Sequence, residues 1–140
     1  EQYFNKYPKV KLYMEKQKEF AQQHGYVETI MKRRRYLRDI YSGNSIVRGV
    51  AERNAINAPI QGSAADMIKA AMIKIFNEIQ KRKLKSAIVL QVHDELVFDV
   101  YKPELEEMKA IVHEGMIYAM PITVPLEIDM KSGNNWLEAH

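Results

Sequence analysis

The residues with the clearest capacity for chemistry are His93, Asp94 and Glu95, three consecutive polar side chains between two apolar segments. The flanking residues, 87–92 (AIVLQV) and 95–100 (ELVFDV), predict two strands joined by a turn at His93 and Asp94. A two-residue hairpin turn usually contains glycine or asparagine, which accept a positive φ, so turn chemistry alone does not select this trio. We therefore expect a rigid, well-buried hairpin that holds the three polar groups at its tip.

Two adjacent carboxylates at such a tip are suited to a divalent cation. Mg²⁺ and Mn²⁺ prefer oxygen ligands, and Mg²⁺ sites commonly use one or two carboxylates together with phosphate oxygens and waters. Because side chains alternate along a strand, both acids cannot face one ion in regular extended structure. We expect Asp94 to be the direct ligand and Glu95 to be a secondary or water-mediated partner. The bare trio also fits a turn whose acids simply face solvent, and the residues alone leave both interpretations open.

A second set of polar residues has helical spacing. Arg53, Asn57 and Gln61, here called the polar row, are four residues apart, and Pro59 lies between the last two. An arginine can contact a phosphate, whereas asparagine and glutamine can reach base or sugar edges in the minor groove. The polar row therefore fits a contact with nucleic acid, and it fits a satisfied surface row or a helix-cap network equally well.

A third candidate is the basic run from Lys32 to Arg38, which contains Arg33, Arg34 and Arg35. So many cations at a predicted hairpin form a plausible ridge for binding phosphates. A basic edge that deters unwanted strand pairing would have the same composition. Both interpretations stay open.

Charge is divided unevenly along the chain, although the net charge is only +3. Residues 1–85 carry 18 Lys and Arg against 8 Asp and Glu, and residues 86–140 carry 3 against 10. A basic part followed by an acidic part suits a polyanion-binding surface beside a carboxylate site, or else two solvated faces of opposite sign. The absence of cysteine excludes disulfides and thiolate metal sites, and no apolar run is long enough to cross a bilayer.

Four helices are predicted from apolar spacing and from signals at helix ends. Pro59 is expected to end the second helix, because the residue before a proline is pushed out of the helical region. Ser63 and Asp66 are then expected to form a capping box that starts the third helix. The predicted helical ranges are 9–23, 45–57, a third that begins at Ser63 and ends in Lys81-Arg82-Lys83, and 103–119.

The predicted strands complete an α+β architecture. Besides the hairpin that carries Asp94, the sequence predicts a hairpin of residues 26–30 and 34–37 and a last strand over residues 124–130. We expect an antiparallel sheet with helices packed on one face. No repeat or flexible linker interrupts the sequence, so the 140 residues are predicted to form a single unit.

At two of these places the sequence is similar to a known family. Residues 91–97 (QVHDELV) resemble the C motif of family A DNA polymerases, and residues 52–62 (ERNAINAPIQG) resemble the segment just upstream of that motif. Two long motifs at compatible spacing are far more specific than one short pattern. The chain thus resembles the C-terminal palm part of a bacterial family A polymerase. Other segments similar to the family, in the same order, are Tyr7-Pro8, 25–29 (GYVET), the Arg-Arg-Arg-Tyr-Leu run and 135–140 (NWLEAH).

The resemblance implies a site and a reaction. Asp94 would coordinate a catalytic Mg²⁺, or Mn²⁺ in its place, Glu95 would support that metal site, and His93 would lie near the primer terminus. The polar row matches positions that contact primer–template DNA near the terminal base pair. The implied reaction is template-directed nucleotidyl transfer, in which a primer 3′-hydroxyl attacks the α-phosphate of a dNTP and two metal ions stabilise the attacking and leaving oxygens. The family also implies a location in the bacterial cytoplasm and no membrane partner.

The sequence departs from the family pattern in several places. Lys32 stands where a turn glycine is usual and Arg38 where a proline is usual, which bears on the geometry of the first hairpin. The DYSQIELR-type motif that carries the family's other metal-binding aspartate, and the helix that binds the dNTP, are not in this sequence. We therefore expect that the chain alone does not polymerise DNA and that its exposed apolar surface favours self-association. The alternative is a non-catalytic DNA-binding module that uses the basic part alone.

Overall fold

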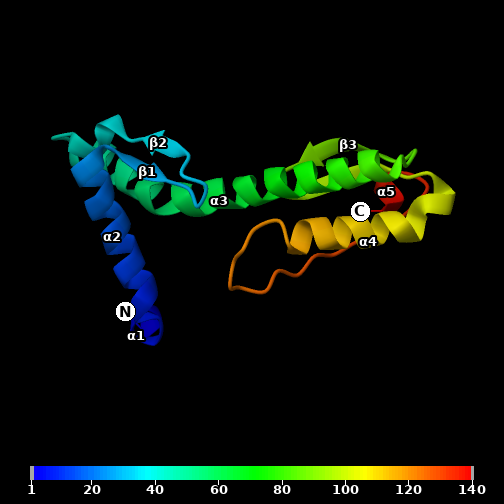
Figure 1. Cartoon of the computed structure of the whole chain (residues 1–140). Helices are drawn as coiled ribbons and strands as arrows, with labels where there is room; N and C mark the ends of the chain where they lie inside the picture. Colours follow the sequence, from blue (N-terminus) through cyan, green and yellow to red (C-terminus); the bar gives the residue numbers. More distant parts are fainter. Residues whose placement is uncertain (1, 140) are drawn as a thin grey trace. The chain divides into compact units, whose positions relative to one another are not determined.

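The computed structural model describes residues 2–139 and shows long helices with two small antiparallel sheets (Figure 1). The α+β class predicted from the sequence is confirmed, although the strands form two separate hairpins instead of one sheet. The residues fall into two compact units, one that ends at Asp66 and one that begins at Met67, and helix α3 (Ser45–Arg82) contributes to both. No described helix is both long enough and apolar enough to cross a bilayer.

The first unit contains two helices, a hairpin and the first part of α3. Its principal helix begins at Pro8, a position where the missing N–H costs no hydrogen bond. That helix ends at Gly25, whose φ of 75° lies in the left-handed region that glycine adopts readily and whose N–H donates to the Ala21 carbonyl at 2.8 Å. The elements are α1 (Gln2–Lys6), α2 (Pro8–His24), β1 (Tyr26–Glu28), β2 (Arg34–Tyr36) and the 3₁₀ turn η1 (Arg38–Tyr41).

The predicted hairpin of residues 26–37 is present, with shorter strands than expected. Tyr26 pairs with Tyr36 at its open end, and the Thr29 N–H donates to the Arg33 carbonyl at 2.9 Å near its turn. Lys32 has a φ of 64° in this turn, so a lysine occupies a conformation that usually selects glycine. A lysine at this position therefore strains the turn locally, but the hairpin still forms.

Helix α3 continues through Pro59, so the predicted break at this residue is wrong. The proline removes one backbone donor, but the buried Ala51, Ala55 and Ala58 keep the preceding turns of the helix packed, and tertiary packing outweighs the local preference. Ser63 consequently lies inside the helix and is not a cap, contrary to the prediction. Its hydroxyl donates to the Pro59 carbonyl at 2.5 Å and accepts from the Ile30 N–H at 2.9 Å.

The core of the first unit forms where the β1–β2 hairpin packs on small residues of α3. Because alanines line this face of the helix, the hairpin backbone can approach it closely. At Gly62 an added Cβ would lie 2.5 Å from Cγ2 of Thr29, which only glycine avoids. The buried residues of this core are Ala21, Val27, Leu37, Ile40, Ala51, Ala55 and Ala58.

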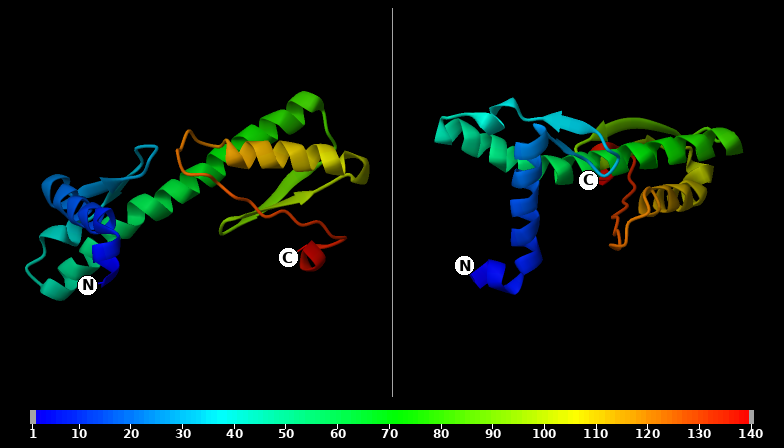
Figure 2. Two further views of the ribbon diagram at one scale, coloured as in Figure 1. Left: turned by 90° about the horizontal axis from the view of Figure 1, so that it is seen from below. Right: turned by 60° about the vertical axis from the view of Figure 1, so that its left-hand side comes forward.

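The second unit contains the C-terminal part of α3, a hairpin and helix α4, which lies beside α3 (Figure 2). On α3, Ile75 and Ile79 are buried, and Ala71 completes the buried row. This row packs against Met108, Ile111 and Val112 of α4. The elements are β3 (Ala87–Val92), β4 (Glu95–Asp99), the 3₁₀ turn η2 (Lys102–Glu104), α4 (Leu105–Ile117) and α5 (Trp136–Ala139).

The C-terminus of α3 has a defined cap. The Leu84 N–H donates to the Ile79 carbonyl and the Lys83 N–H donates to the Gln80 carbonyl, both at 3.1 Å, which is the Schellman pattern. Lys83 has the left-handed φ of 55° that this motif requires. Leu84 packs against the core that contains Ile79, so the chain leaves the helix in a fixed direction toward β3.

Two expectations for the second unit are wrong. Residues 124–130 form no strand, because they pair with no other strand among the described residues. The β3–β4 hairpin is not well buried either. Val89 and Leu90 of β3 have 58% and 43% of their surface exposed, since within the part of the chain that the structure describes only one face of the hairpin is covered.

Candidate functional site

The hairpin that carries the acidic residues is fixed at its base. Ser86 is buried, its hydroxyl donates to Oε2 of Glu104 at 2.6 Å, and it accepts the Tyr101 N–H at 3.0 Å. Glu104 also accepts the backbone N–H groups of Lys85 and Ser86. These hydrogen bonds, first that from the Lys85 N–H, lower the pKa of Glu104. The ionised carboxylate thus ties the entry of β3 to the exit of β4.

The tip of the hairpin has the two-residue turn predicted at His93 and Asp94, and Val92 pairs with Glu95 across it. His93 has a φ of 52°, and its carbonyl accepts the Gln91 side-chain amide at 2.7 Å. A non-glycine residue in this region is uncommon and is retained when surrounding structure determines it. The strained turn therefore places the acids at the end of the two strands.

Asp94 and Glu95 are both exposed at this tip. Among the residues that the structure describes, no hydrogen bond or ion pair engages the Asp94 carboxylate, whereas Glu95 has an interaction. An exposed Asp94 without a basic partner fits a direct metal ligand. No group of three or more possible metal ligands gathers anywhere in residues 2–139, so the donor set fits only part of the coordination sphere of Mg²⁺.

The polar row lies on the exposed face of α3, opposite its buried alanines. Because the helix runs unbroken through Pro59, Gln61 continues the row that Arg53 and Asn57 begin, each one turn after the last. The alignment that the expected break would have disturbed is therefore present. The row belongs to the first unit and Asp94 to the second.

The three arginines of the basic run have different surroundings. Arg33 donates from Nε to Asp66 at 2.5 Å and from a terminal nitrogen to the Gly62 carbonyl at 3.1 Å. Arg34 donates to Glu28 at 3.1 Å and lies over the Tyr26 ring, 4.4 Å from its centroid. Arg35 is exposed, and no ion pair within the described part of the chain involves it.

Two acidic partners of these arginines were not recognised in the sequence. Asp66 was assigned to a capping box, and instead it is buried beneath the hairpin and bound by Arg33. Burial opposes its ionisation, but hydrogen bonds from Thr29 and Arg33 lower the pKa of its carboxyl. The sequence signal that could have indicated the buried position of Asp66 is a single acidic residue beside the apolar residues of a helix. Glu28 likewise has a lowered pKa, because Arg34 first and then Lys32 hydrogen-bond to it.

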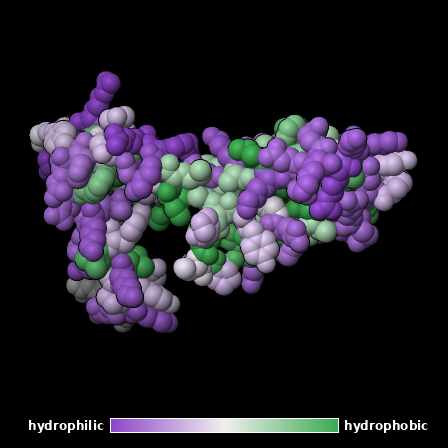
Figure 3. Space-filling model, in the orientation of Figure 1, coloured by the Kyte–Doolittle hydropathy of each residue, from purple (hydrophilic) through white to green (hydrophobic). Residues whose placement is uncertain are grey.

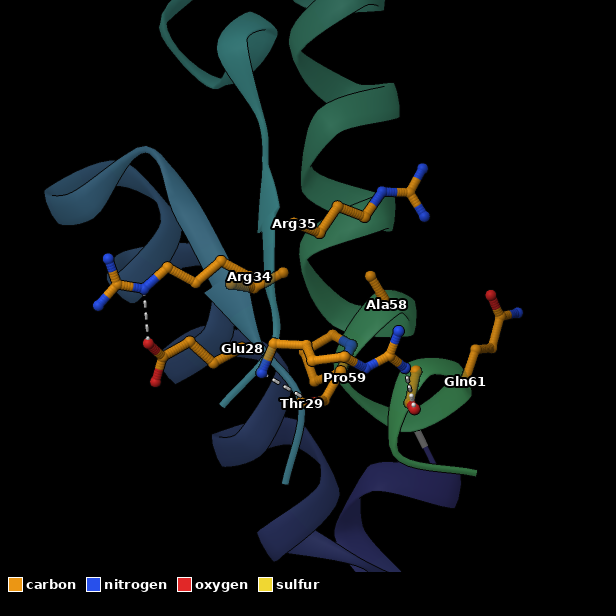
Figure 4. A pocket seen from close by; sticks show the side chains of 10 residues that line it. Glu28, Thr29, Arg34, Arg35, Ala58, Pro59 and Gln61 are labelled. Atoms are coloured by element: carbon orange, nitrogen blue, oxygen red, sulfur yellow. Dashed lines mark hydrogen bonds and ion pairs between the residues drawn. The ribbon is translucent and has the colours of Figure 1, made fainter. Parts of the chain in front are cut away.

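A cavity of about 190 Å³ lies beside the β1–β2 hairpin and the adjoining turn of α3 (Figure 4). In the close-up Arg34 extends toward Glu28, while Arg35 and Gln61 extend toward the opposite side. The cavity thus brings the three arginines of the basic run and the last member of the polar row to a common space. Its lining residues are Val27, Glu28, Thr29, Arg33, Arg34, Arg35, Ala58, Pro59, Gln61 and Gly62.

A second, apolar groove of about 420 Å³ lies between α3 and β3 in the second unit. Ile73 and Phe76 of α3 are 62% and 53% exposed, and Val89 and Leu90 face the same groove from β3. Hydrophobic residues also reach the surface among hydrophilic ones in the space-filling view (Figure 3). This groove contains no titratable group and is no site for chemistry.

The sequence and the fold match known proteins over nearly all of the chain. The family model "DNA polymerase family A" matches residues 1–138. DNA polymerase I of Lactococcus lactis subsp. cremoris is 49% identical and that of Bacillus subtilis 45%, each over 99% of this chain. The POL domain of Pol1 from M. smegmatis, in complex with DNA primer-template and dNTP, superimposes with a TM-score of 0.96 and 46% identity over 99% of this chain.

This chain accounts for a small part of those proteins. It spans 16% of the length of the Lactococcus and Bacillus polymerases and 24% of the M. smegmatis chain. The hairpin with its two acids and the polar row on α3 both fall within the matched residues. From the motifs, the fold and these matches together, the chain belongs to DNA polymerase family A.

Proposed function

We propose that this chain is one part, in the palm and fingers region, of a bacterial cytoplasmic DNA-directed DNA polymerase, and that Asp94 is a ligand of its catalytic metal. The observation that carries the proposal is the strained hairpin tip, which presents an exposed Asp94 carboxylate without a basic partner among the described residues. The match to a polymerase domain whose complex contains primer-template DNA and dNTP supports the proposed substrates.

The chain's own residues have separate tasks in this proposal. Asp94 holds Mg²⁺, or Mn²⁺ in its place, and Glu95 supports the same metal site. Metal ions held there would supply stabilisation of the attacking and leaving oxygens of the phosphoryl transfer. The polar row contacts the primer–template duplex, and its glutamine and asparagine reach the minor-groove edge of base pairs near the primer terminus. His93, held in the turn, lies beside that terminus.

The test uses the complete polymerase that contains this chain. Asp94→Ala is expected to lower the rate of primer extension by at least about 100-fold, because losing even an indirect support of a metal site costs that order. DNA affinity, measured by fluorescence anisotropy of labelled primer–template, is expected to stay within about threefold. Extension that stays at the wild-type rate would refute the assignment and would favour a non-catalytic DNA-binding role.

A matched control is available on the same hairpin. Asp99 is an exposed aspartate at the far end of β4, opposite Ala87. Asp99→Ala changes the net charge by the same amount as Asp94→Ala, so both variants weaken general electrostatic repulsion of DNA equally. Only the variant at the tip is expected to lose extension.

A further inference from the structure

We propose that Ser63 and an internal ion pair, Arg33 with Asp66, are positioning residues for the polar row. These three residues, here called the brace, fix the turn of α3 around Pro59 and thereby hold Gln61 for its contact with the edge of a base pair. The inference rests on the proposed function, because it takes the polar row as a base-pair contact. The brace itself touches no DNA in this proposal and acts only through the backbone that carries Gln61.

Helix α3 has an interrupted hydrogen-bond pattern just before Gln61. Pro59 carries no N–H, so the carbonyl of Ala55, four residues earlier, loses its usual donor within the helix. Sharp bends in helices occur mostly at proline and at a few similar interruptions, because the bonds that fix one turn on the next are missing there. The direction of Gln61 relative to Asn57 therefore depends on contacts from outside the helix.

The part of α3 before Pro59 is fixed by the core of the first unit. Its buried alanines pack against residues of α2 and of the β1–β2 hairpin. In addition, the Tyr13 hydroxyl of α2 donates to the Ile56 carbonyl at 3.1 Å. Asn57, which follows directly, thus projects from a backbone that is held on its other side.

The turn after Pro59 is held by a different set of contacts, and Ser63 is the first of them. Its hydroxyl donates to the Pro59 carbonyl at 2.5 Å and accepts the Ile30 N–H at 2.9 Å. One side chain thus joins the proline turn to the backbone of the β1–β2 turn. The two turns are also in close contact, because an added Cβ at Gly62 would lie 2.5 Å from Cγ2 of Thr29.

The ion pair of the brace supplies a second connection. Arg33 donates from Nε to Asp66 at 2.5 Å, and Asp66 has only 2% of its side chain exposed. A terminal nitrogen of Arg33 donates to the Gly62 carbonyl at 3.1 Å, next to Gln61. Separating the hairpin from α3 here would leave a buried charge without its partner, which is costly. The backbone of Gln61 is therefore held from the hairpin side, while its side chain extends away from the hairpin (Figure 4).

A fixed position of Gln61 matters for the choice between matched and mismatched primer termini. The minor-groove edges of Watson–Crick pairs present a degenerate pattern of acceptors, and a mismatched pair displaces them. A hydrogen bond weakens steeply outside a narrow range of length and angle. A donor that is held in place loses its bond to a displaced acceptor, whereas a donor on a loosened turn can follow it. The brace thus acts on specificity.

The test compares extension of matched and mismatched primers by the complete polymerase. Ser63→Ala removes both hydroxyl bonds and is expected to lower the ratio of kcat/KM for matched over mismatched termini by about fivefold, the equivalent of one hydrogen bond. The Kd of primer–template is expected to stay within about twofold, because phosphate contacts dominate affinity. Ser63→Thr keeps a hydroxyl and is expected to restore the ratio. An unchanged ratio in Ser63→Ala, or no restoration in Ser63→Thr, would overturn the proposal.

Two further variants test the ion pair and the choice of position. Arg33→Gln combined with Asp66→Asn removes both charges and is expected to lower the ratio as Ser63→Ala does. A wild-type ratio in this double variant would overturn the role given to the ion pair. Ser45 is an exposed serine in the first turn of the same helix, and Ser45→Ala is expected to keep the wild-type ratio. An equal loss in Ser45→Ala would show a general effect on α3 and would overturn the brace.

A double-mutant cycle with Gln61→Ala separates positioning from a general loss of structure. If Ser63 acts through Gln61, Ser63→Ala has no further effect on the ratio in the Gln61→Ala polymerase, and additive effects would overturn the proposal. If Gln61→Ala lowers the ratio while Ser63→Ala does not, the base-pair contact stands and only the brace is wrong. If Gln61→Ala leaves the ratio unchanged, the contact in the proposed function fails, and the brace fails with it.

Discussion

At the scale of single residues, the place of His93, Asp94 and Glu95 at a hairpin tip could be predicted from the sequence, and the pairing of Val92 with Glu95 confirms that turn. Their chemistry stays a prediction, made because no ordinary turn preference explains that trio. The partners of Asp66 could not be read. An aspartate three residues after Ser63 has the spacing of a capping box, and the same aspartate can equally pair with a distant arginine. Only the packing of the hairpin on α3, 33 residues away in sequence, decides between these possibilities.

Asp66 is expected to make stability depend on pH at the acid side. Its folded-state pKa lies below the ordinary value of 3.8, so its contribution is complete above that value and is lost as the pH falls through the lower folded pKa. Asp66→Asn should therefore lower the free energy of unfolding at neutral pH by about 1–2 kcal/mol. Urea unfolding from pH 7 downward should show the wild type and the variant converging, and a constant difference across this range would contradict the assignment.

At the scale of elements, apolar periodicity predicted α2, α4 and both hairpins, although only α4 buries a full row of apolar residues and α2 buries only Ala21. The same reasoning failed at Pro59, where buried alanines in the preceding turns keep α3 packed and the helix continues. It also failed at residues 124–130, because an apolar alternating segment becomes a strand only when another strand supplies its hydrogen bonds. Periodicity describes one element at a time and does not show which partners are present.

The contact between α3 and α4 depends on Gly115. An added Cβ there would lie 2.4 Å from Cγ1 of the buried Ile75, so Gly115→Ala is expected to destabilise the second unit by about 1–3 kcal/mol through overpacking. Hydrogen exchange of the α4 amides in the complete polymerase measures this loss locally.

Gly49 provides the control, because the nearest atom to an added Cβ is the Arg53 guanidinium at 3.9 Å. Gly49→Ala is expected to stabilise α3 by up to about 1 kcal/mol through helix propensity. Equal effects of the two substitutions would show that propensity outweighs packing at Gly115.

At the scale of the whole molecule, the sequence identified the family because two long motifs keep their order and spacing. It could not reveal that the described residues form two compact units, since α3 continues from one to the other without a linker. The acidic part of the sequence includes the proposed metal ligand, and the basic part includes the polar row and the basic run. The uneven charge thus corresponds to two kinds of proposed site.

The isolated 140-residue chain is expected to show no primer extension and to self-associate. One exposed pair of carboxylates supplies too few ligands for two metals. The apolar groove between α3 and β3 offers a surface for a second copy. Gel-extension assays and analytical ultracentrifugation measure the two properties, and Phe76→Lys should shift the chain toward monomer. Extension by the pure chain, or a monomer at high concentration, would contradict these expectations.

The lysine in the cap of α3 has a practical consequence for the heat tolerance of this chain. Lys83 adopts a left-handed conformation that a glycine would occupy without steric cost. Lys83→Gly is therefore expected to raise the thermal stability of the chain. Lys83 lies outside the polar row, the basic run and the acidic tip. A substitution at this cap changes none of the residues of the proposed sites.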